Sequence, residues 1–528
     1  MLVVNTNVSA LKAQRELTRT RSGLSEAMER ISSGVRLNSS RDDATGVGIS
    51  QRMTSQINGL SRAMQNANDG IGFLQTAEGA LQEVTNLMQQ MREMALQAID
   101  GANNNTDIFS LQSRVVELTA EVNRISDQTE LNGKKLLNGD VVSAEFQVGI
   151  RADQKIRVSI ASASSLDIGN YATTSNSIGL NAIGAARIGE VPQEAPSNFV
   201  QGQTLTIRGF SSAATATEVI VDFEESARSI AAKINLEENR SGVSAIAKTR
   251  LTLENIFNQA AGSGEQTISF NLYGTNRKAI NLEQTTAVFI EANITEEGQG
   301  VNLRKLVDAI NAQAIKTGVT ASEISSGKIE LIQENGENIS IEKFVNASGV
   351  DAATGLPFED TLTVTGLEGT PPVDLIEGTT EDSVTVGGIV TFNSYKAFTV
   401  TSDALLDDSL FGQGFEFFLQ GAVFTSLADI DLKAGGAAQS LQVITSGLDF
   451  ISSLRGELGS LQNRFESTIA NLGSVRENAE AARSRVQDAD FAVETAKLTK
   501  AQILQEAGIA ILAQANTIPQ AVLALLRA

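Results

Sequence analysis

The sequence predicts a multidomain protein: an all-α coiled-coil rod built from both chain termini, with a small β-hairpin, and α+β and β-rich domains inserted between its two halves. Three observations predict this fold class. Apolar residues near both ends recur every three or four positions, as on one face of a helix. The middle of the chain instead has alternating, strand-like patterns. At 528 residues the chain is also more than three times as long as an ordinary domain of about 150 residues.

The N-terminal half of the rod is predicted to be two helices that fold back as an αα-hairpin. Over residues 57–95 the apolar positions step by three and four, with one slip before Ala77, as in a coiled-coil seam with a stammer. The stretch 101–105 (GANNN) breaks this helix. Thr106 or Asp107 can cap the second helix, which has regularly spaced apolar residues over 108–125.

A β-hairpin is predicted after these helices. Asn132 and Gly133 form a turn that ends the helical part. Residues 146–150 and 156–160 then alternate apolar and polar side chains on either side of a polar loop at 151–154. This pattern is typical of two paired strands.

The C-terminal part has the strongest periodicity of the chain. Apolar residues recur every seven positions at Ile444, Ile451, Leu458, Phe465, Leu472, Ala479, Val486 and Val493. This seam predicts one continuous helix over 444–493, roughly 75 Å long at about 1.5 Å per residue. A helix of this length cannot bury its apolar stripe alone. We therefore expect it to pack on the N-terminal helices.

The segment between the helical ends, residues 179–434, is predicted to be an insertion with an internal repeat. The helix-like segment ending at Asn235 is similar to the one ending at Asn311, and Gly242 and Gly318 each follow seven residues later, an offset of 76 in both places. We expect two strand-helix-strand modules near 196–258 and 265–346, and a strand-rich unit near 360–425.

Composition excludes several kinds of chemistry. The chain has no Cys and no His, which excludes thiolate metal sites, Ser-His-Asp triads and His-ligated zinc. Carboxylate-, Lys- or Tyr-based catalysis stays open, but pairs such as Asp407 and Asp408 lack a partner cluster and suit a solvated loop. The sequence therefore predicts no enzyme, cofactor or metal site.

The charge balance and the hydropathy pattern bear on possible partners. The net charge of −21 argues against nucleic acid, whose phosphates need clustered Lys and Arg, and against anionic membrane surfaces. There is no apolar run of ~18 residues to span a bilayer. The first residues lack the basic and apolar regions of a Sec signal, so export would need another route.

Both extreme tails have apolar stripes with little around them to cover those stripes. We expect them to be disordered in a free monomer and to order when neighbouring subunits bury them. A plain intramolecular bundle and, for the last helix, a membrane-surface helix are the alternatives. The predicted subunit-packing residues are Leu11, Leu17, Ile31, Ile503, Leu504, Ile511, Leu512, Val522, Leu525 and Leu526.

Four stretches at the termini are distinctive: residues 5–11 (NTNVSAL), 30–44 (RISSGVRLNSSRDDA), 127–137 (DQTELNGKKLL), and 501–508 (AQILQEAG) with 512–516 (LAQAN) and Pro519-Gln520. In this order they closely resemble the bacterial flagellin family, over roughly residues 1–175 and 435–528. The middle corresponds to the variable insertion of that family, and its two repeats look like modules of flagellins and hook-associated proteins.

The resemblance implies a structural subunit that self-assembles into the extracellular flagellar filament for motility. Residues 1–42 with 485–528 would form inner-tube helices, 43–178 with 435–484 the helical rod core with its β-hairpin, and 179–434 the outer domains. It also implies export by the flagellar type III system, with an export chaperone, a filament cap and hook-filament junction proteins as partners. The implied spoke segment between inner tube and rod contains Arg36, Asn38, Arg41, Asp42 and Asp43.

The resemblance also points to a region that an animal innate receptor recognises in many flagellins. Arg92 and Glu93 match that region, but receptor-active members commonly have a basic residue in place of Gln90 and an acidic one in place of Arg114. We expect weakened recognition.

Two other functions stay open beside the filament subunit. One is a hook-filament junction protein. The other is surface or glycan binding by the insertion of a flagellin scaffold. A zinc-protease insertion is excluded by the absence of His.

Overall fold

The computed structural model describes residues 6–100, 103–175, 184–189, 194–209, 216–256, 265–276, 287–297, 300–325, 327–347, 361–366, 370–377, 379, 381–404, 410–411, 420–433 and 436–527. The chain forms two compact units, each built from segments far apart in sequence. One unit contains Met1–Ala80, Gln128–Ala161 and Leu454–Ala528, and the other contains Leu81–Asp127 and Ser162–Ser453.

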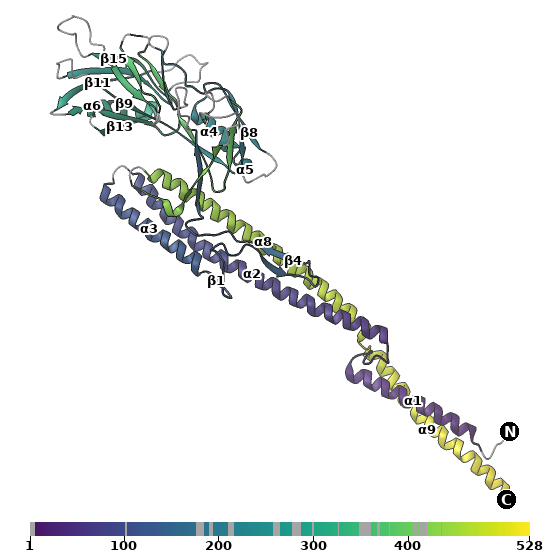
Figure 1. Ribbon diagram of the computed structural model, residues 1–528. Helices are drawn as coiled ribbons and strands as arrows, with labels where there is room; N and C mark the ends of the chain where they lie inside the picture. Colours follow the sequence, from purple (N-terminus) through teal and green to yellow (C-terminus); the bar gives the residue numbers. More distant parts are fainter. Residues whose placement is uncertain are drawn as a thin grey trace, which may run out of the picture. The chain divides into compact units, whose positions relative to one another are not determined.

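Long helices from both ends of the chain and a β-rich middle confirm the predicted fold class (Figure 1). Helix α2 (Ala44–Ile99) and helix α8 (Ala437–Gln487) each contribute to both units. The predicted seam is the buried face of α8 as far as Leu472. Seam residues with at most 8% exposure are Ile444, Ile451, Leu458, Phe465 and Leu472.

The prediction of one continuous helix through Val493 is wrong. Helix α8 ends at Gln487, and α9 (Phe491–Arg527) begins after three intervening residues. The carbonyl of Gln487 accepts from the backbone N–H of Arg36 at 2.7 Å, and the N–H of Ala489 donates to the carbonyl of Gly34 at 3.0 Å. These bonds to residues 34–36 use backbone groups that would be paired within the helix if α8 continued.

Side-chain caps mark where new helices begin. Asp490 Oδ1 accepts from the backbone N–H groups of Ala492 and Val493 at 2.9 and 3.2 Å, which satisfies the first turn of α9. The cap of α3 (Asn105–Gln128) is Asn104, and the prediction of Thr106 or Asp107 is wrong. Asn104 Oδ1 accepts from the backbone N–H groups of both residues at 2.8 and 2.9 Å.

The predicted β-hairpin is confirmed. Strand β3 (Ala144–Gln147) pairs antiparallel with β4 (Lys155–Val158). Phe146 of this hairpin packs edge-on between Phe73 of α2 and Phe465 of α8, with ring centroids 5.6 Å apart in both pairs. A smaller hairpin joins β1 (Glu130–Leu131) to β2 (Lys134–Lys135) through Asn132 and Gly133, at φ 52° and 75°, the left-handed values of a type I′ turn.

The insertion contains three antiparallel sheets in its described part. The first has the order β12-β11-β10-β15-β18-β6, the second β13-β14-β9-β19-β5-β22, and the third β21-β20-β7-β8. Their strands are β5 (Gly169–Thr174), β6 (Ala186–Ile188), β7 (Gln203–Arg208), β8 (Thr217–Val221), β9 (Ser244–Glu254), β10 (Glu265–Tyr273), β11 (Val288–Glu297), β12 (Gly300–Asn302), β13 (Val319–Ser325), β14 (Lys328–Gln333), β15 (Ile339–Ala347), β18 (Val384–Val386), β19 (Ile389–Ser394), β20 (Thr399–Ser402), β21 (Gln420–Gly421) and β22 (Val423–Ser426). Strand β16 (Thr361–Thr365) also pairs with β9, and β17 (Val373–Ile376) pairs with β16.

The two repeat copies share one local structure. Helices α4 (Ala227–Leu236) and α5 (Glu238–Ser241) precede β9, as α6 (Arg304–Ala312) and α7 (Ala314–Thr317) precede β13. Asn235 bonds both backbone groups of Ala245, accepting at 2.7 Å and donating at 2.9 Å. Asn311 does the same to Ala321 at 2.8 and 2.9 Å. The matching Asn residues therefore have the same role in both copies.

Strands from the predicted strand-rich stretch 360–425 join the sheets of both copies. Strand β16 pairs with β9, β18 with β15, and β20 with β7. Two apolar cores result from this mixing. One contains Phe270 and Phe344 and the other contains Phe392, Phe398 and Phe411.

Candidate subunit-packing surface

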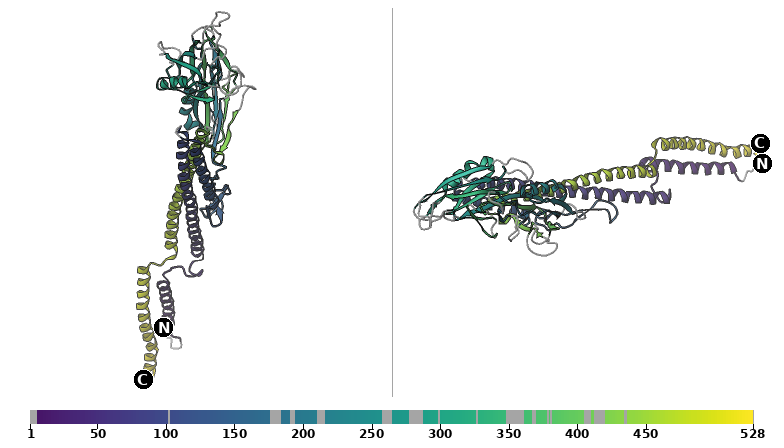
Figure 2. Two further views of the ribbon diagram at one scale, coloured as in Figure 1. Left: turned by 90° about the vertical axis from the view of Figure 1, so that its left-hand side faces the viewer. Right: turned by 90° about the horizontal axis from the view of Figure 1, so that it is seen from above.

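Helices α1 (Val8–Ser33) and α9 pack antiparallel along their length, and both further views show them side by side (Figure 2). Asn7 Nδ2, at the start of α1, donates to the carbonyl of Ala515 at 2.8 Å, whereas Arg30, near its end, lies 3.4 Å from Glu494. The half-buried or buried positions of α1 repeat with heptad spacing at Ala10, Ala13, Leu17, Thr20, Leu24, Ala27 and Ile31. Those of α9 repeat likewise at Glu494, Leu498, Ala501, Gln505, Gly508, Leu512 and Ala515.

An ion-pair cluster around the buried Glu494 joins the last turn of α1 to the first turn of α9. Glu494 is 4% exposed and lies 2.7 Å from Lys497 Nζ and 3.4 Å from Arg30. Arg30 also pairs with Glu26. The hydrogen bond from Lys497, assisted by Arg30, holds the pKa of Glu494 below its ordinary value although burial acts to raise it. This cluster was missed by the sequence analysis, because its members are polar and belong to helices far apart in sequence.

The predicted subunit-packing residues divide between the two sides of this helix pair. Leu17, Ile31 and Leu512 lie on the faces that α1 and α9 turn toward each other. Four others point away and are largely exposed: Leu11 (59%), Ile503 (61%), Leu504 (48%) and Ile511 (60%). The side chains of Val522, Leu525 and Leu526 lie outside the described part of α9.

Several large apolar side chains of α9 lie on its exposed faces. Its seam toward α1 contains small or polar residues such as Gln505 and Gly508, whereas Ile503, Ile509 and Ile511 remain about half exposed or more. Helical spacing places Ile503 opposite the covered seam, with Ile509 and Ile511 on either side of it. A helix that is apolar on several faces is normally buried on all of them, so one partner helix does not complete the packing of α9.

The segment between α1 and α2 folds against the break between α8 and α9. Arg36 donates through its guanidinium to the carbonyl of Val486 at 2.7 Å, and Val35 bridges Asp488. Asn38 Nδ2 donates to Glu29 at 2.9 Å, and Arg41 is exposed.

Two adjacent carboxylates, Asp42 and Asp43, accept hydrogen bonds from backbone N–H groups of this segment. Asp42 accepts from the backbone N–H groups of Ser39 and Asn38 at 2.8 and 3.2 Å, and the bond from Ser39 is the main cause of its lowered pKa. Asp43 Oδ1 accepts from the N–H of Thr45 at 3.0 Å and so caps α2. All five predicted spoke residues thus lie in one short connector.

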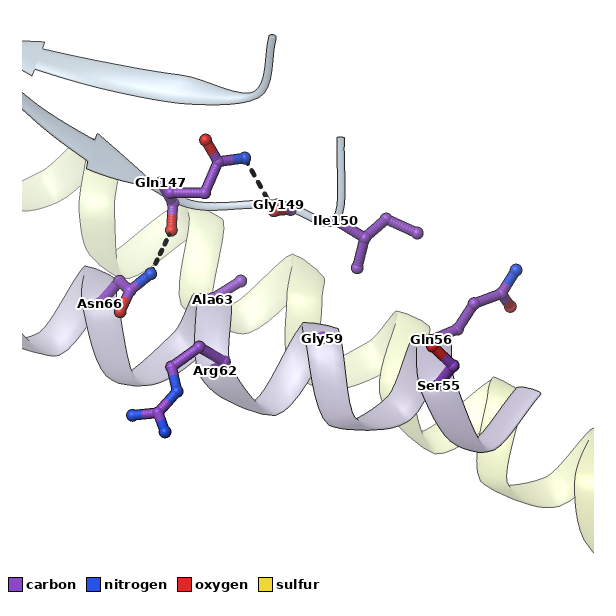
Figure 3. A pocket seen from close by; sticks show the side chains of 9 residues that line it. All are labelled: Ser55, Gln56, Gly59, Arg62, Ala63, Asn66, Gln147, Gly149 and Ile150. Carbon is purple, nitrogen blue, oxygen red and sulfur yellow. Dashed lines mark hydrogen bonds between the residues drawn. The ribbon is translucent and has the colours of Figure 1, made fainter. Parts of the chain in front are cut away.

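A groove of about 420 Å³ separates α2 from the loop of the β3–β4 hairpin (Figure 3). Ile150 points toward Gly59, where an added Cβ would lie 2.8 Å from the Ile150 side chain. Asn66 Nδ2 donates to the carbonyl of Gln147 at 2.9 Å. A small residue on α2 and one amide therefore hold the hairpin loop on this helix.

The residues implied in receptor recognition are all exposed. Gln90, Arg92 and Glu93 lie on α2 and Arg114 lies on α3.

Among the residues described, no group of three His, Cys, Asp or Glu side chains could hold a metal ion. None of the helices in the described ranges combines the length and apolar character needed to cross a membrane.

The paired terminal helices therefore leave large apolar side chains uncovered within one chain. Residues 4–141 match the bacterial flagellin N-terminal helical region, and residues 441–526 match the bacterial flagellin C-terminal helical region. The chain is 35% identical to B-type flagellin of Pseudomonas aeruginosa, with 100% of both chains covered. It is 31% identical to flagellin B of Vibrio cholerae and 29% identical to flagellin of Salmonella typhimurium, each with 99% of both chains covered.

The chain therefore belongs to the bacterial flagellin family, and it is a structural subunit of the flagellar filament rather than an enzyme. Its assembly partners are further flagellin subunits. FliC from Burkholderia pseudomallei aligns at 18% identity over 75% of this chain and 99% of that chain, with a TM-score of 0.27. Membership in the family rests on the sequence relationship.

Proposed function

We propose that polymerisation buries the outward apolar faces of α1 and α9. The single observation that supports this most is the exposure of Ile503 and Ile511 at about 60% each, on a helix that α1 covers along one seam only. Burying apolar surface yields about 25 cal/mol per Å², so each such side chain contributes ~1–2 kcal/mol when a neighbour covers it. Neighbouring subunits then supply the contacts that a lone α1–α9 pair lacks.

In this proposal each segment of the chain has its own place in the filament. Residues 1–42 with 485–528 form the inner tubes, 43–178 with 435–484 form the rod core, and 179–434 face outward. The connector with Arg36, Asn38, Arg41, Asp42 and Asp43 acts as the spoke between inner tube and rod. Its bonds to Val486 and Gln487 support this role because they join the α1–α2 connector to the end of α8, where the chain continues to α9.

We further propose that the filament lies outside the cell and that the flagellar type III system exports the subunit. An export chaperone would cover the apolar C-terminal helix before export, and a filament cap and hook-filament junction proteins would contact the assembled subunits. The exposed Leu504 and Ile511 support the need for a chaperone, because such surfaces associate in water when left uncovered.

Seeded polymerisation tests the packing proposal. Monomers dissociated from filaments are mixed with short seeds and imaged by electron microscopy. We expect long growth for the natural chain and no growth after deletion of residues 503–528. We expect Ile503→Ser with Ile511→Ser to raise the critical monomer concentration at least tenfold, as a loss of about 1.4 kcal/mol implies.

The matched control keeps apolar volume at the same positions. Ile503→Leu with Ile511→Leu should grow at nearly the natural critical concentration. Equal growth of the Ser and Leu variants would show that these faces are not buried in the filament. A natural chain that stays monomeric with seeds would instead favour the hook-filament junction protein.

For the receptor region, we infer weakened recognition by the animal innate receptor. A reporter-cell assay should show a stronger response to monomers with Gln90→Arg and Arg114→Glu than to the natural chain. An unchanged response would remove these two positions from the explanation.

A further inference from the structure

The chain enters and leaves the insertion through two segments that lie side by side. Strand β5 pairs antiparallel with β22, in a register that places Gly169 opposite Ser426. Just outside this pair, the N–H of Leu427 donates to the carbonyl of Ile168 at 2.8 Å, and that of Ala428 donates to Ser165 at 3.1 Å. The two crossings therefore form one paired base for the insertion.

Gln112 of α3 holds the returning crossing. Its Nε2 donates to the carbonyl of Ile430 at 3.1 Å, and its Oε1 accepts from the N–H of Leu432 at 2.7 Å. Ile430 and Leu432 are 7% and 1% exposed. A side-chain amide offers a donor and an acceptor in one planar group, so Gln112 satisfies two backbone groups as a neighbouring strand would.

Asn123 of α3 holds the outgoing crossing in a similar way. Its Oδ1 accepts from the backbone N–H of Ser165 at 2.9 Å and from the hydroxyl of Ser164 at 3.4 Å. Ser165 is fully buried. Each of the two crossings thus has an amide side chain from the same helix bound at its base.

The spacing of these two amides puts them on one face of α3. Eleven residues are close to three helical turns, so Gln112 and Asn123 point the same way and lie roughly 16 Å apart along the axis. Both are next to the buried seam of Leu111, Val115 and Val122. The apolar seam of α3 is therefore buried by packing, whereas the two amides beside it bind the two crossings of the insertion.

An apolar contact fixes the same base from the side of α8. Ile168 is fully buried, and an added Cβ at Gly447 would lie 2.6 Å from Ile168 Cγ2 and from Met88 Cε. Ser446 next to it donates to Asn170 at 3.0 Å, and Asn170 donates to Asn393 at 2.8 Å. The base of the insertion is therefore bound by α3 and by α8.

We propose that Gln112 and Asn123 are positioning residues that fix the orientation of the insertion on the helical part of its own unit. α3 then has a second function beside core packing: it sets the direction in which the outer domains project. In a filament this direction decides whether the outer domains of neighbouring copies have room, so loosening it should disorder the outer layer while the helical lattice remains.

Hydrogen exchange of the full-length monomer tests this inference without reference to assembly. Gln112→Leu keeps the side-chain volume but removes both hydrogen bonds. We expect exchange at the amides of residues 430–432 to rise about tenfold or more, with little change at 162–168. Asn123→Leu should give the reverse pattern, and Gln112→Glu, which keeps the acceptor and loses the donor, should be intermediate.

Glu117→Gln, an exposed change on the same helix, is the matched control and should leave both segments unchanged. If residues 430–432 exchange in Gln112→Leu at the same rate as in the natural chain, the proposal is overturned. An equal rise over 444–458 of α8 would also overturn it, because the residue would then serve general stability only.

A second readout uses filaments and rests on the proposed polymerisation. Filaments of the double variant Gln112→Leu and Asn123→Leu should keep the helical parameters of the natural core in cryo-electron microscopy, while density for 179–434 weakens. Outer density as sharp as in the natural filament would contradict the positioning role. If the double variant does not polymerise, the exchange experiment still decides the question.

Discussion

Leu17 of α1 and Gly508 of α9 touch across the terminal helix pair: a Cβ at Gly508 would lie 3.0 Å from Cδ1 of Leu17. Leu17 is 8% exposed. The missing side chain at Gly508 makes room for Leu17, and small residues such as Ala27 and Ala501 occupy other positions of the same seam. Close approach of the two helices therefore depends on side-chain size at a few positions.

Gly508→Val should weaken the α1–α9 pair. Overpacking a tight contact costs ~1–3 kcal/mol, which outweighs the few tenths that Val gains over Gly in helix propensity. The midpoint of thermal filament dissociation, followed by circular dichroism, should fall. Adding Leu17→Ala to Gly508→Val should cost less than the sum of the single changes. Strict additivity would mean that the two residues do not share this contact.

Filament stability should fall on acidification, in part through Glu494. Its pKa is held below the usual 4.5 by Lys497 and Arg30. A carboxylate with a depressed pKa contributes stability that is complete above its unfolded value and is lost as pH falls through the folded value. We expect dissociation midpoints to be flat near neutral pH and to drop below about pH 4.5.

Glu494→Gln provides the control for this pH dependence. It should lower filament stability by ~1 kcal/mol at pH 7, because it replaces charge-assisted hydrogen bonds with neutral ones. Its pH curve should be less steep in the acid range than that of the natural chain. Parallel curves for the two proteins would assign the acid sensitivity to other carboxylates.

Gly70→Ala should destabilise the helical core through Phe465. A Cβ at Gly70 would lie 2.8 Å from Cζ of that fully buried ring. The steric cost of ~1–3 kcal/mol exceeds the ~1 kcal/mol that Ala gains over Gly in a helix. Because the ring also packs on Phe146, movement of Phe465 disturbs the hairpin as well.

A double-mutant cycle with Phe465→Leu, measured by chemical denaturation of the monomer, checks the Gly70 prediction. The smaller side chain at 465 leaves room for the added methyl group. We therefore expect Gly70→Ala to be nearly neutral in the Phe465→Leu background. A cost as large as in the natural background would locate the strain elsewhere.

Asn235→Ala and Asn311→Ala should have similar effects in the two repeat copies. Each change leaves a nearly buried N–H and carbonyl unpaired, on Ala245 or Ala321, at ~1–3 kcal/mol per change. Hydrogen exchange of the full chain should rise at the start of β9 in the first variant and of β13 in the second. An effect confined to one copy would mean that the shared geometry does not imply a shared role.

Much of the fold could be predicted from local pattern. Residues such as Leu81, Val84 and Met88 recur at helical spacing and are fully buried, because burial of one face is what imposes that spacing. The matching environments of Asn235 and Asn311 follow from the sequence repeat alone. The break after Gln487 was not predicted, because its cause is backbone pairing with residues 34–36, some 450 positions away.

The candidate packing surface could be predicted only in part. Sequence identified Leu17 and Ile503 alike as apolar residues of the tails, but it contained no information on which of them α1 and α9 cover within one chain. Leu17 is covered and Ile503 is not. The buried Glu494 was missed because its burial depends on packing against α1, where Arg30 joins the local pair that Glu494 makes with Lys497.

The helical ends, the strand-rich insertion with its repeat, and membership in the flagellin family can be read along the chain, since each depends on residue spacing or on sequence similarity. The exposed faces of α1 and α9, the strands that pair with β9, and the hold of Gln112 and Asn123 on the base of the insertion emerge only from the folded chain. Periodicity shows whether a residue is buried, whereas its partner depends on contacts between segments distant in sequence.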